Sequence, residues 1–265
     1  MTSPIVTSLV SDLGAEVAAL KVVLVDLSDG DWRMPTPAPG WTVHDQIAHL
    51  AHFDEVTLTA ITDPAGFAAL VASMGDLQRY VDAVGPANSH RHPADMLAWW
   101  LEANKSLRAA ALHAPDGLRV SWFGPSMSVP SKLTARIMET WAHGQDVVDT
   151  FGATRPATDR LRHVARIGVQ TIGHSFLTHG RPAPTAPIHV SLTPPNGGAP
   201  WQWGDPGSIN RVTGPAEDFC LVVTQRRHVQ DTRLDVTGEV AEQWMNQAQA
   251  FAGPPGAGRK PGQFA

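Results

Sequence analysis

The amino-acid sequence predicts an α+β protein, in which a helical bundle is followed by a smaller α/β domain with a short antiparallel sheet. Two observations support this class. The first ~150 residues contain four long segments and one shorter segment with apolar residues at helical spacing. The composition then shifts to short alternating segments interrupted by Pro, Gly and Asn, as in antiparallel sheets. We therefore assign the bundle to residues 1–155 and the second domain to residues 156–265.

The predicted helices of the bundle begin and end at residues that favour helix termini. Thr42 and Asp45 form a capping-box pattern before an apolar-periodic run. Gly152 is the expected terminator of the last helix. The predicted helices cover residues 4–27, 42–61, 65–83, 92–114 and 131–151.

In the second domain, residues 157–179 are expected to be helical and the strands to lie within residues 188–214. Residues 215–227 are ambiguous because their β-branched content favours a strand. Their apolar residues nevertheless follow helical spacing after Pro215, and we favour a helix. A further helix is expected in residues 239–251, followed by an irregular Gly/Pro-rich tail.

Composition excludes several classes of function. The chain has 265 residues and a formal net charge of −5, which argues against binding to nucleic acid or to an anionic membrane. No apolar run reaches the ~18–20 residues that span a bilayer, and the N-terminus lacks the pattern of a signal peptide. The single cysteine, Cys220, is expected to be buried packing. We expect a cytoplasmic monomer or homodimer that acts on small molecules.

Glu139 and His143 are the first candidates for a chemical site. They are one helical turn apart, so both side chains leave the same face of the helix. Such a pair is usually solvated. Here the neighbouring Met138, Trp141 and Ala142 make the helix too apolar for a purely exposed one, and inward-facing polar groups would need partners.

A third ligand is offered by the helix that starts at Thr42. His49 lies between Ile47 and Leu50, near the apolar side of that helix. Facing helices of a bundle commonly assemble metal sites, and two histidines with one glutamate form the ligand set of an open zinc site. We expect His49, Glu139 and His143 to bind a divalent metal, with zinc the preferred ion.

The segments "GWTVHDQIAHLAHFDE" and "METWAHGQDVVD" resemble the DinB-like metal-binding helical bundles. More narrowly, they resemble the mycothiol-dependent maleylpyruvate isomerases of actinobacteria. The resemblance implies the same three metal ligands, a DinB-like four-helix bundle with a small α/β domain after it, and mycothiol as cosubstrate. The matching residues are Trp41, Thr42, Val43, His49, Leu50, Glu139, His143 and Asp146.

The second domain departs from that family. The isomerase has a catalytic arginine after a helix with a Gly-Arg ending, whereas here the helix ends "TQRR" without the glycine. Arg226 or Arg227 is expected to take that role and to hold a carboxylate of the thiol or substrate. The alternative is a solvated helix end. The ending "FAGPPGAGRKPG" points to a distinct subfamily, so the substrate need not be maleylpyruvate.

Three further residues are candidates for binding the cosubstrate. Asp146 lies almost one turn beyond His143 and is expected to orient an imidazole or a water, or else to pair locally. His52 is expected to line the pocket, or else to lie on the surface. Arg259 in the tail is a candidate anion ligand, or else a solvated side chain.

The sequence thus favours a metal-dependent thiol transferase or isomerase. Two alternatives stay open: a hydrolase or lyase that uses metal-bound water, and a non-catalytic protein that binds a metal or small molecule.

Overall fold

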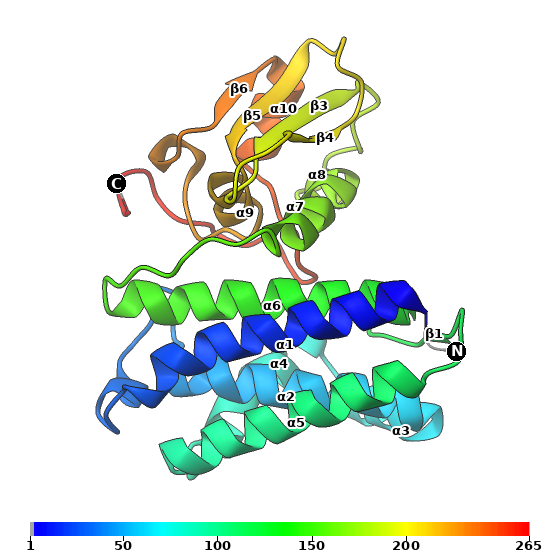
Figure 1. Cartoon of the computed structure of the whole chain (residues 1–265), viewed down its shortest axis with the longest axis vertical. Coiled ribbons are helices and arrows are strands. Elements are labelled where there is room, and N and C mark those ends of the chain that lie inside the picture. The colour runs from blue at the N-terminus through cyan, green and yellow to red at the C-terminus, as the bar shows by residue number, and fades with distance from the viewer. Residues whose placement is uncertain (1–2, 265) are drawn as a thin grey trace. The chain divides into compact units, whose positions relative to one another are not determined.

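The structure of the chain is a computed structural model that describes residues 3–264. The chain divides into two compact units, Met1–Thr154 and Arg155–Ala265. The first unit is helical and the second combines helices with a small sheet (Figure 1). The predicted fold class is therefore confirmed, and each unit is described below by itself.

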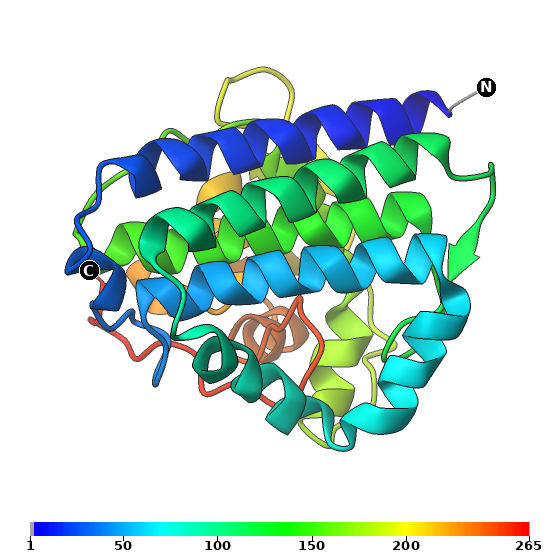
Figure 2. The same cartoon turned by 90° about the horizontal axis from the view of Figure 1, so that it is seen from below.

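Four long helices form the bundle of the first unit. They are α1 (Pro4–Val25), α2 (Val43–Thr62), α5 (Pro93–His113) and α6 (Val129–Thr150). Helix α2 packs mainly on α5, and α1 packs mainly on α6, while α2 and α6 are also neighbours. Two shorter helices carry the chain back along the bundle, so that α5 runs in the same direction as α2 (Figure 2). This order makes α2 and α6 antiparallel, which brings the first half of α2 beside the second half of α6.

The shorter helices correct one sequence prediction. Residues 65–83 were expected to form one helix, but the chain forms α3 (Pro64–Met74) and α4 (Leu77–Asn88). The break falls at Gly75, whose φ of 70° is left-handed. Asp76 then caps α4 by accepting a hydrogen bond from the backbone N–H of Arg79 at 2.9 Å. Gly75 thus serves as a helix terminator in the middle of an otherwise helical pattern.

The start of α2 follows the predicted capping box. The Thr42 hydroxyl accepts from the backbone N–H of Asp45 at 3.2 Å, and the Asp45 carboxylate accepts from the backbone N–H of Thr42 at 2.9 Å. A one-turn helix, η1 (Asp31–Arg33), precedes it. Between α5 and α6, strands β1 (Arg119–Val120) and β2 (Met127–Ser128) form a small antiparallel pair in the segment that lies between two predicted helices.

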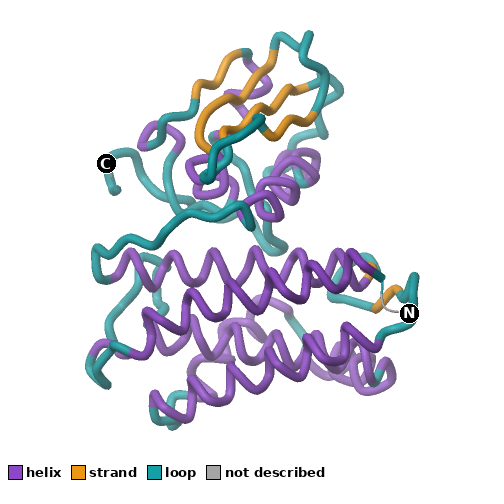
Figure 3. Tube along the Cα trace, in the orientation of Figure 1, coloured by secondary structure: helices purple, strands orange, loops and turns teal. Residues whose placement is uncertain are grey.

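The second unit begins with α7 (Leu161–Gln170) and α8 (Ile172–Thr178), which break the predicted helix 157–179 at Thr171. Its later elements include both strands and helices (Figure 3). They are β3 (Ile188–Thr193), β4 (Trp201–Trp203), β5 (Asn210–Pro215), α9 (Ala216–Val223), η2 (Val229–Asp231), β6 (Asp235–Thr237) and α10 (Glu239–Met245).

The sheet of the second unit has the strand order β4-β3-β5-β6. Two of its pairs are antiparallel, as predicted, whereas β3 and β5 are parallel. The parallel pair arises because β4 takes one edge of β3, and the chain then crosses to the other edge before β5 begins. Short alternating segments indicate strands but do not specify which neighbours pair.

The ambiguous segment after Pro215 is helical, as favoured, because its apolar spacing buries one face of α9. Phe219 and Cys220 are completely buried there. Burial raises the pKa of the Cys220 thiol well above its ordinary value, as expected for packing rather than nucleophilic chemistry. Helix α10 ends sooner than predicted, and residues 252–264 form no helix or strand. Within residues 3–264, no helix is long and apolar enough to cross a membrane.

Candidate metal centre

Side chains from α2 and α6 meet inside the bundle. His49 lies on α2, and Glu139 and His143 lie one turn apart on α6. One potential ligand atom from each residue lies within 4.8 Å of the other two. Nε2 of His49 is 3.7 Å from Oε2 of Glu139, and Nε2 of His143 is 3.2 Å from the same oxygen. The structure therefore brings together the three residues expected to bind a metal.

The protonation states of the triad suit a cation. Burial lowers the pKa of His49 to about 3, so its imidazole is neutral at pH 7. Burial alone would raise the pKa of Glu139, but the neighbouring side chains of His143 and His49 outweigh it and hold that pKa well below its usual range. The cluster thus presents a carboxylate and a neutral imidazole, the forms that bind metal ions.

Gln46 holds the ring of His143. Its side-chain Oε1 accepts a hydrogen bond from Nδ1 of His143. The amide cannot be turned around, because its Nε2 donates to the Thr36 hydroxyl at 2.9 Å, and that hydroxyl itself donates to the carbonyl of Trp41 at 2.8 Å. Nδ1 of His143 therefore carries a proton, and Nε2 is the nitrogen directed at Glu139. Sequence reasoning missed Gln46, although its place one turn before His49 was the available signal.

His49 is held by packing instead. Its ring lies 4.5 Å from that of Phe53, 5.2 Å from that of Trp41 and 4.4 Å from that of His143, measured between centroids. Its Nδ1 is buried without a hydrogen-bond partner in the structure. Trp41 also stacks on His143, with 19° between the ring planes, so one indole contacts both imidazoles. Trp41 was part of the sequence motif, and in the structure it packs against the rings of both histidines.

An aromatic cluster continues from His49 into the bundle. Phe53 contacts Phe123, and Phe123 contacts Tyr80 and Trp122. His52 belongs to this cluster because its Nε2 shares a hydrogen bond with the Tyr80 hydroxyl, and its ring packs edge-on against Phe53. The ring of His52 thus lies beside Phe53 and not among the three ligand atoms.

The other predicted residues lie as follows. Asp146 is completely buried on α6. Arg226 and Arg227 follow α9 in the second unit, and Arg259 lies in the tail of that unit. Arg227 and Arg259 share one aromatic neighbour, since their guanidinium carbons lie 4.2 and 6.0 Å from the ring centroid of Phe264.

The helix end before the arginines clarifies the departure from the family pattern. Gln225 has a left-handed backbone with φ of 61°, a conformation that glycine adopts most easily. The backbone N–H of Arg226 then returns to the carbonyl of Leu221 at 2.7 Å, as after a glycine at a helix C-terminus. Gln225 thus stands in the conformation expected for the missing glycine, and Arg226 takes the position directly after it.

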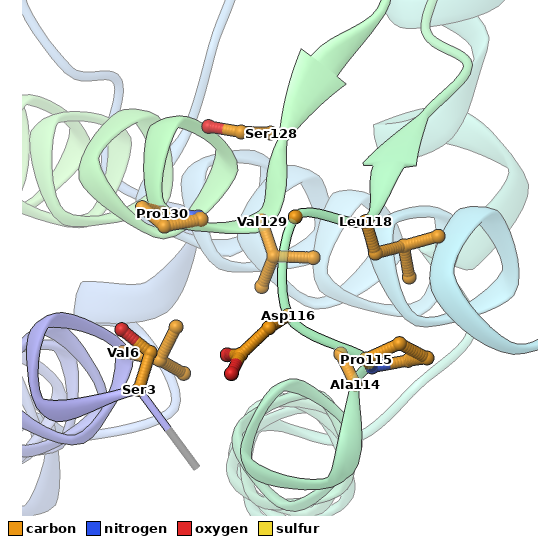
Figure 4. Close-up of a pocket in the computed structure, with 10 residues that line it drawn as sticks. Ser3, Val6, Ala114, Pro115, Asp116, Leu118, Ser128, Val129 and Pro130 are labelled. Carbon is orange, nitrogen blue, oxygen red and sulfur yellow. The ribbon is translucent and has the colours of Figure 1, made fainter. Parts of the chain in front are cut away.

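A separate hollow lies at the end of the bundle where α1 starts and α5 ends. It has a volume of about 130 Å³, and the side chains of Val6, Asp116 and Val129 face it (Figure 4). Asp116 is the one acidic residue among those that line it, and the ligand triad is not part of its wall. We assign no chemistry to this hollow.

The fold and the site define a class: a helical bundle with an inward His-Glu-His cluster, followed by a small α/β unit. Residues 13–148 match the family model described as the mycothiol maleylpyruvate isomerase N-terminal domain. The chain belongs to this family. It is 46% identical over 251 residues to two Mycobacterium tuberculosis proteins, named "Uncharacterized protein Rv0036c" and "Uncharacterized protein MT0041", with 94% of this chain and 97% of each relative covered.

Two solved structures share the fold. The crystal structure of the mycothiol-dependent maleylpyruvate isomerase aligns with a TM-score of 0.57, and that of its H52A mutant aligns with a TM-score of 0.56. Each alignment covers 84% of this chain and 90% of the other, at 14% sequence identity. The likeness extends beyond the residues matched by the family model and includes part of the second unit.

Proposed function

We propose that this protein is a divalent-metal-dependent enzyme that activates a small-molecule thiol of the mycothiol kind. The thiol would be transferred to an electrophilic small molecule, or would catalyse the isomerisation of that molecule. The observation that carries the proposal is the convergence of His49, Glu139 and His143 within 4.8 Å, in a chain of the mycothiol maleylpyruvate isomerase family.

The residues present fit a zinc ion. Two imidazoles and one carboxylate are a usual protein ligand set for catalytic zinc, which leaves a position for a further ligand. His49 has a depressed pKa and is ready to bind without losing a proton. Gln46 fixes the tautomer of His143, as hydrogen-bond partners of zinc-binding histidines commonly do.

The charge of the ligand set favours a thiolate. Glu139 contributes one negative charge and neutral imidazoles contribute none, so one positive charge of a divalent ion stays uncompensated. A bound divalent ion supplies the field that lowers the pKa of a thiol and so yields a nucleophile at neutral pH. Because the triad is mostly buried, a singly charged anion is the favoured partner at the open position.

Side chains of the first unit are proposed to position the reactants, and an arginine of the second unit is proposed to bind the substrate. Trp41 covers the two imidazoles, and Phe53 begins the aromatic cluster that keeps one side of the centre apolar. We assign the substrate's carboxylate to Arg226, since it follows the left-handed Gln225 as the family's arginine follows a glycine. Asp146 and His52 are proposed to orient a ligand or the thiol.

The test uses the zinc-loaded chain with mycothiol and a cell extract, followed by mass spectrometry. We expect metabolites that gain the mass of the thiol, or isomers that form only when mycothiol is present. A Glu139→Gln variant should lose this activity, whereas Glu102→Gln, at an exposed position on α5, should retain it. Equal activity without mycothiol would favour a metal-dependent hydrolase, and no change in either arm would favour a non-catalytic binding protein; both results contradict the proposal.

A further inference from the structure

The second unit contains an open cavity that the proposed metal chemistry does not use. Its volume is about 300 Å³, at the lower end of the range for small-molecule sites. Basic and amide side chains dominate its polar wall, and no acidic residue lines it. They include Arg227, His228, Gln247, Arg259 and Lys260.

A buried amide in this wall lacks a partner. Gln247 is 7% exposed, and its Nε2 makes no hydrogen bond in the structure. The wall thus includes an amide N–H that no acceptor among the described residues satisfies. His228 offers a second donor, because its Nδ1 accepts from the backbone N–H of Gln230 at 3.2 Å and its proton must then reside on Nε2.

The C-terminal tail, of which residues 256–261 line the cavity, is held by two hydrogen bonds. Gln249, which is completely buried, accepts from the backbone N–H of Gly256 at 3.0 Å. Asp231 accepts from the backbone N–H of Gly262 at 2.7 Å. Arg259 and Lys260 lie between these two anchors, so the tail holds both cations at the cavity. A side chain at position 256 would collide with Gln225, whose Oε1 would lie 2.0 Å from the added Cβ.

We propose that this cavity binds a small anion bearing a carboxylate or phosphate group. Arg227, Arg259 and Lys260 would supply the positive charge, and His228 would supply a neutral donor. Because cationic side chains and no acidic residue line the cavity, its wall disfavours metal ions and cationic ligands. The two hydrogen bonds that anchor the tail hold these side chains in place. This site rests on the second unit alone and stands independently of the metal proposal.

The test measures binding of succinate and inorganic phosphate to the full chain by calorimetry, at constant ionic strength. We expect saturable binding of at least one anion. The anion with the higher affinity shows whether the cavity prefers a carboxylate or a phosphate group. Gln247→Glu keeps the side-chain size and breaks no internal hydrogen bond, but it places a negative charge in the cavity, so binding should fall below detection. The double variant Arg259→Gln/Lys260→Gln should weaken binding at least about tenfold.

The matched control is Arg79→Gln/Lys105→Gln, which removes the same number of charges from exposed positions of the first unit and should bind as the wild type does. Glu139→Gln should also leave anion binding unchanged, which separates this site from the metal centre. The proposal would be overturned if neither succinate nor phosphate bound saturably. It would also be overturned by binding that Gln247→Glu leaves intact, or by binding that only Glu139→Gln abolishes.

Discussion

At the scale of single residues, Gln46 determines which nitrogen of His143 faces Glu139. The amide is locked by Thr36, and Thr36 in turn is locked by the backbone of Trp41. A metal-binding histidine gains affinity when a hydrogen bond fixes its tautomer and the orientation of its ring. The segment before α2 therefore supports the proposed metal centre, although it contributes no proposed ligand.

We expect Gln46→Ala to weaken zinc binding by about 10–100-fold, because His143 loses the acceptor that fixes its tautomer. Gln46→Glu retains an acceptor oxygen and should restore most of the affinity. Competition with a chromophoric chelator measures both. Gln78→Ala, on the exposed side of α4, serves as the control. Equal affinities for Gln46→Ala and the control would show that the hydrogen bond is only structural.

Lys132 is a second residue of interest on α6. It is 2% exposed, and its Nζ lies 2.8 Å from the ring centroid of Trp122. Burial, with help from the charge of Arg136, lowers its pKa well below the ordinary 10.5, while Glu139 and Asp54 oppose this effect. Within residues 3–264, no carboxylate forms a salt bridge with it. Its ammonium form therefore costs stability at neutral pH.

Lys132→Met should raise the free energy of unfolding at pH 7 by about 1 kcal/mol or more. Between the lowered pKa and 10.5 the unfolded chain binds more protons at this residue than the folded chain, so wild-type stability gains from rising pH. The advantage of the variant should consequently shrink as the pH approaches 10.5. Urea unfolding at several pH values measures it, and a constant difference would contradict the account.

The clustering of the three proposed ligands was predictable from the sequence because it follows from helical spacing and apolar neighbours. Glu139 and His143 share a face, and His49 lies at the apolar boundary of its helix. The hydrogen bond from His143 to Gln46 was not predictable, because these residues are 97 positions apart in the sequence and periodicity does not specify such contacts. The cavity in the second unit could not be predicted from the sequence either, since only the folded tail brings Lys260 and Gln247 to the same wall.

At the scale of elements, a buried polar network fixes how α6 lies against its neighbours. Nε of Arg136 on α6 donates to Asp54 on α2 at 2.8 Å, and both side chains are almost completely buried. Asn104 on α5 donates to the other oxygen of Asp54 at 3.0 Å. Arg136 lies almost one turn before Glu139, so this network also sets the position of the proposed metal ligands on α6.

Asp54→Ala should destabilise the first unit by about 3–5 kcal/mol, because it leaves the buried guanidinium of Arg136 without its carboxylate. Chemical denaturation followed by circular dichroism measures this. Asp82→Ala, on the exposed side of α4, should change stability by less than about 0.5 kcal/mol. Similar small losses in both variants would show that water replaces Asp54 and that the network does not hold the helices.

The elements also show which features of the fold apolar periodicity can predict and which it cannot. Apolar periodicity located the four long helices to within a few residues, since each buries one face in the bundle. It did not find the break at Gly75, where one backbone conformation ends α3 and a new cap starts α4. The pairing of β3 with β5 was also beyond reach, because strand partners are chosen by the fold and not by local composition.

At the scale of the whole molecule, the two proposed sites lie in different units. The first unit contains the proposed metal centre, and the second contains Arg226 and the anion cavity. Metal binding should therefore stabilise the first unit selectively. Since two units need not unfold in one step, we expect zinc to shift only one part of a thermal transition.

An excess of zinc about a hundredfold above its Kd should add about 2.7 kcal/mol to the stability of the first unit. Scanning calorimetry with and without a chelator measures this shift. Arg259→Gln, a substitution in the second unit, should leave the shift intact. An equal shift in Glu139→Gln would place the stabilising ion elsewhere.

The measurement that tests the central claim most directly is the zinc content of the purified chain after equilibrium dialysis. The account predicts one zinc ion per chain in the wild type and in His90→Ala, and much less than one in His49→Ala, Glu139→Gln and His143→Ala. If His49→Ala bound as much zinc as the wild type, the three residues would not form the metal centre.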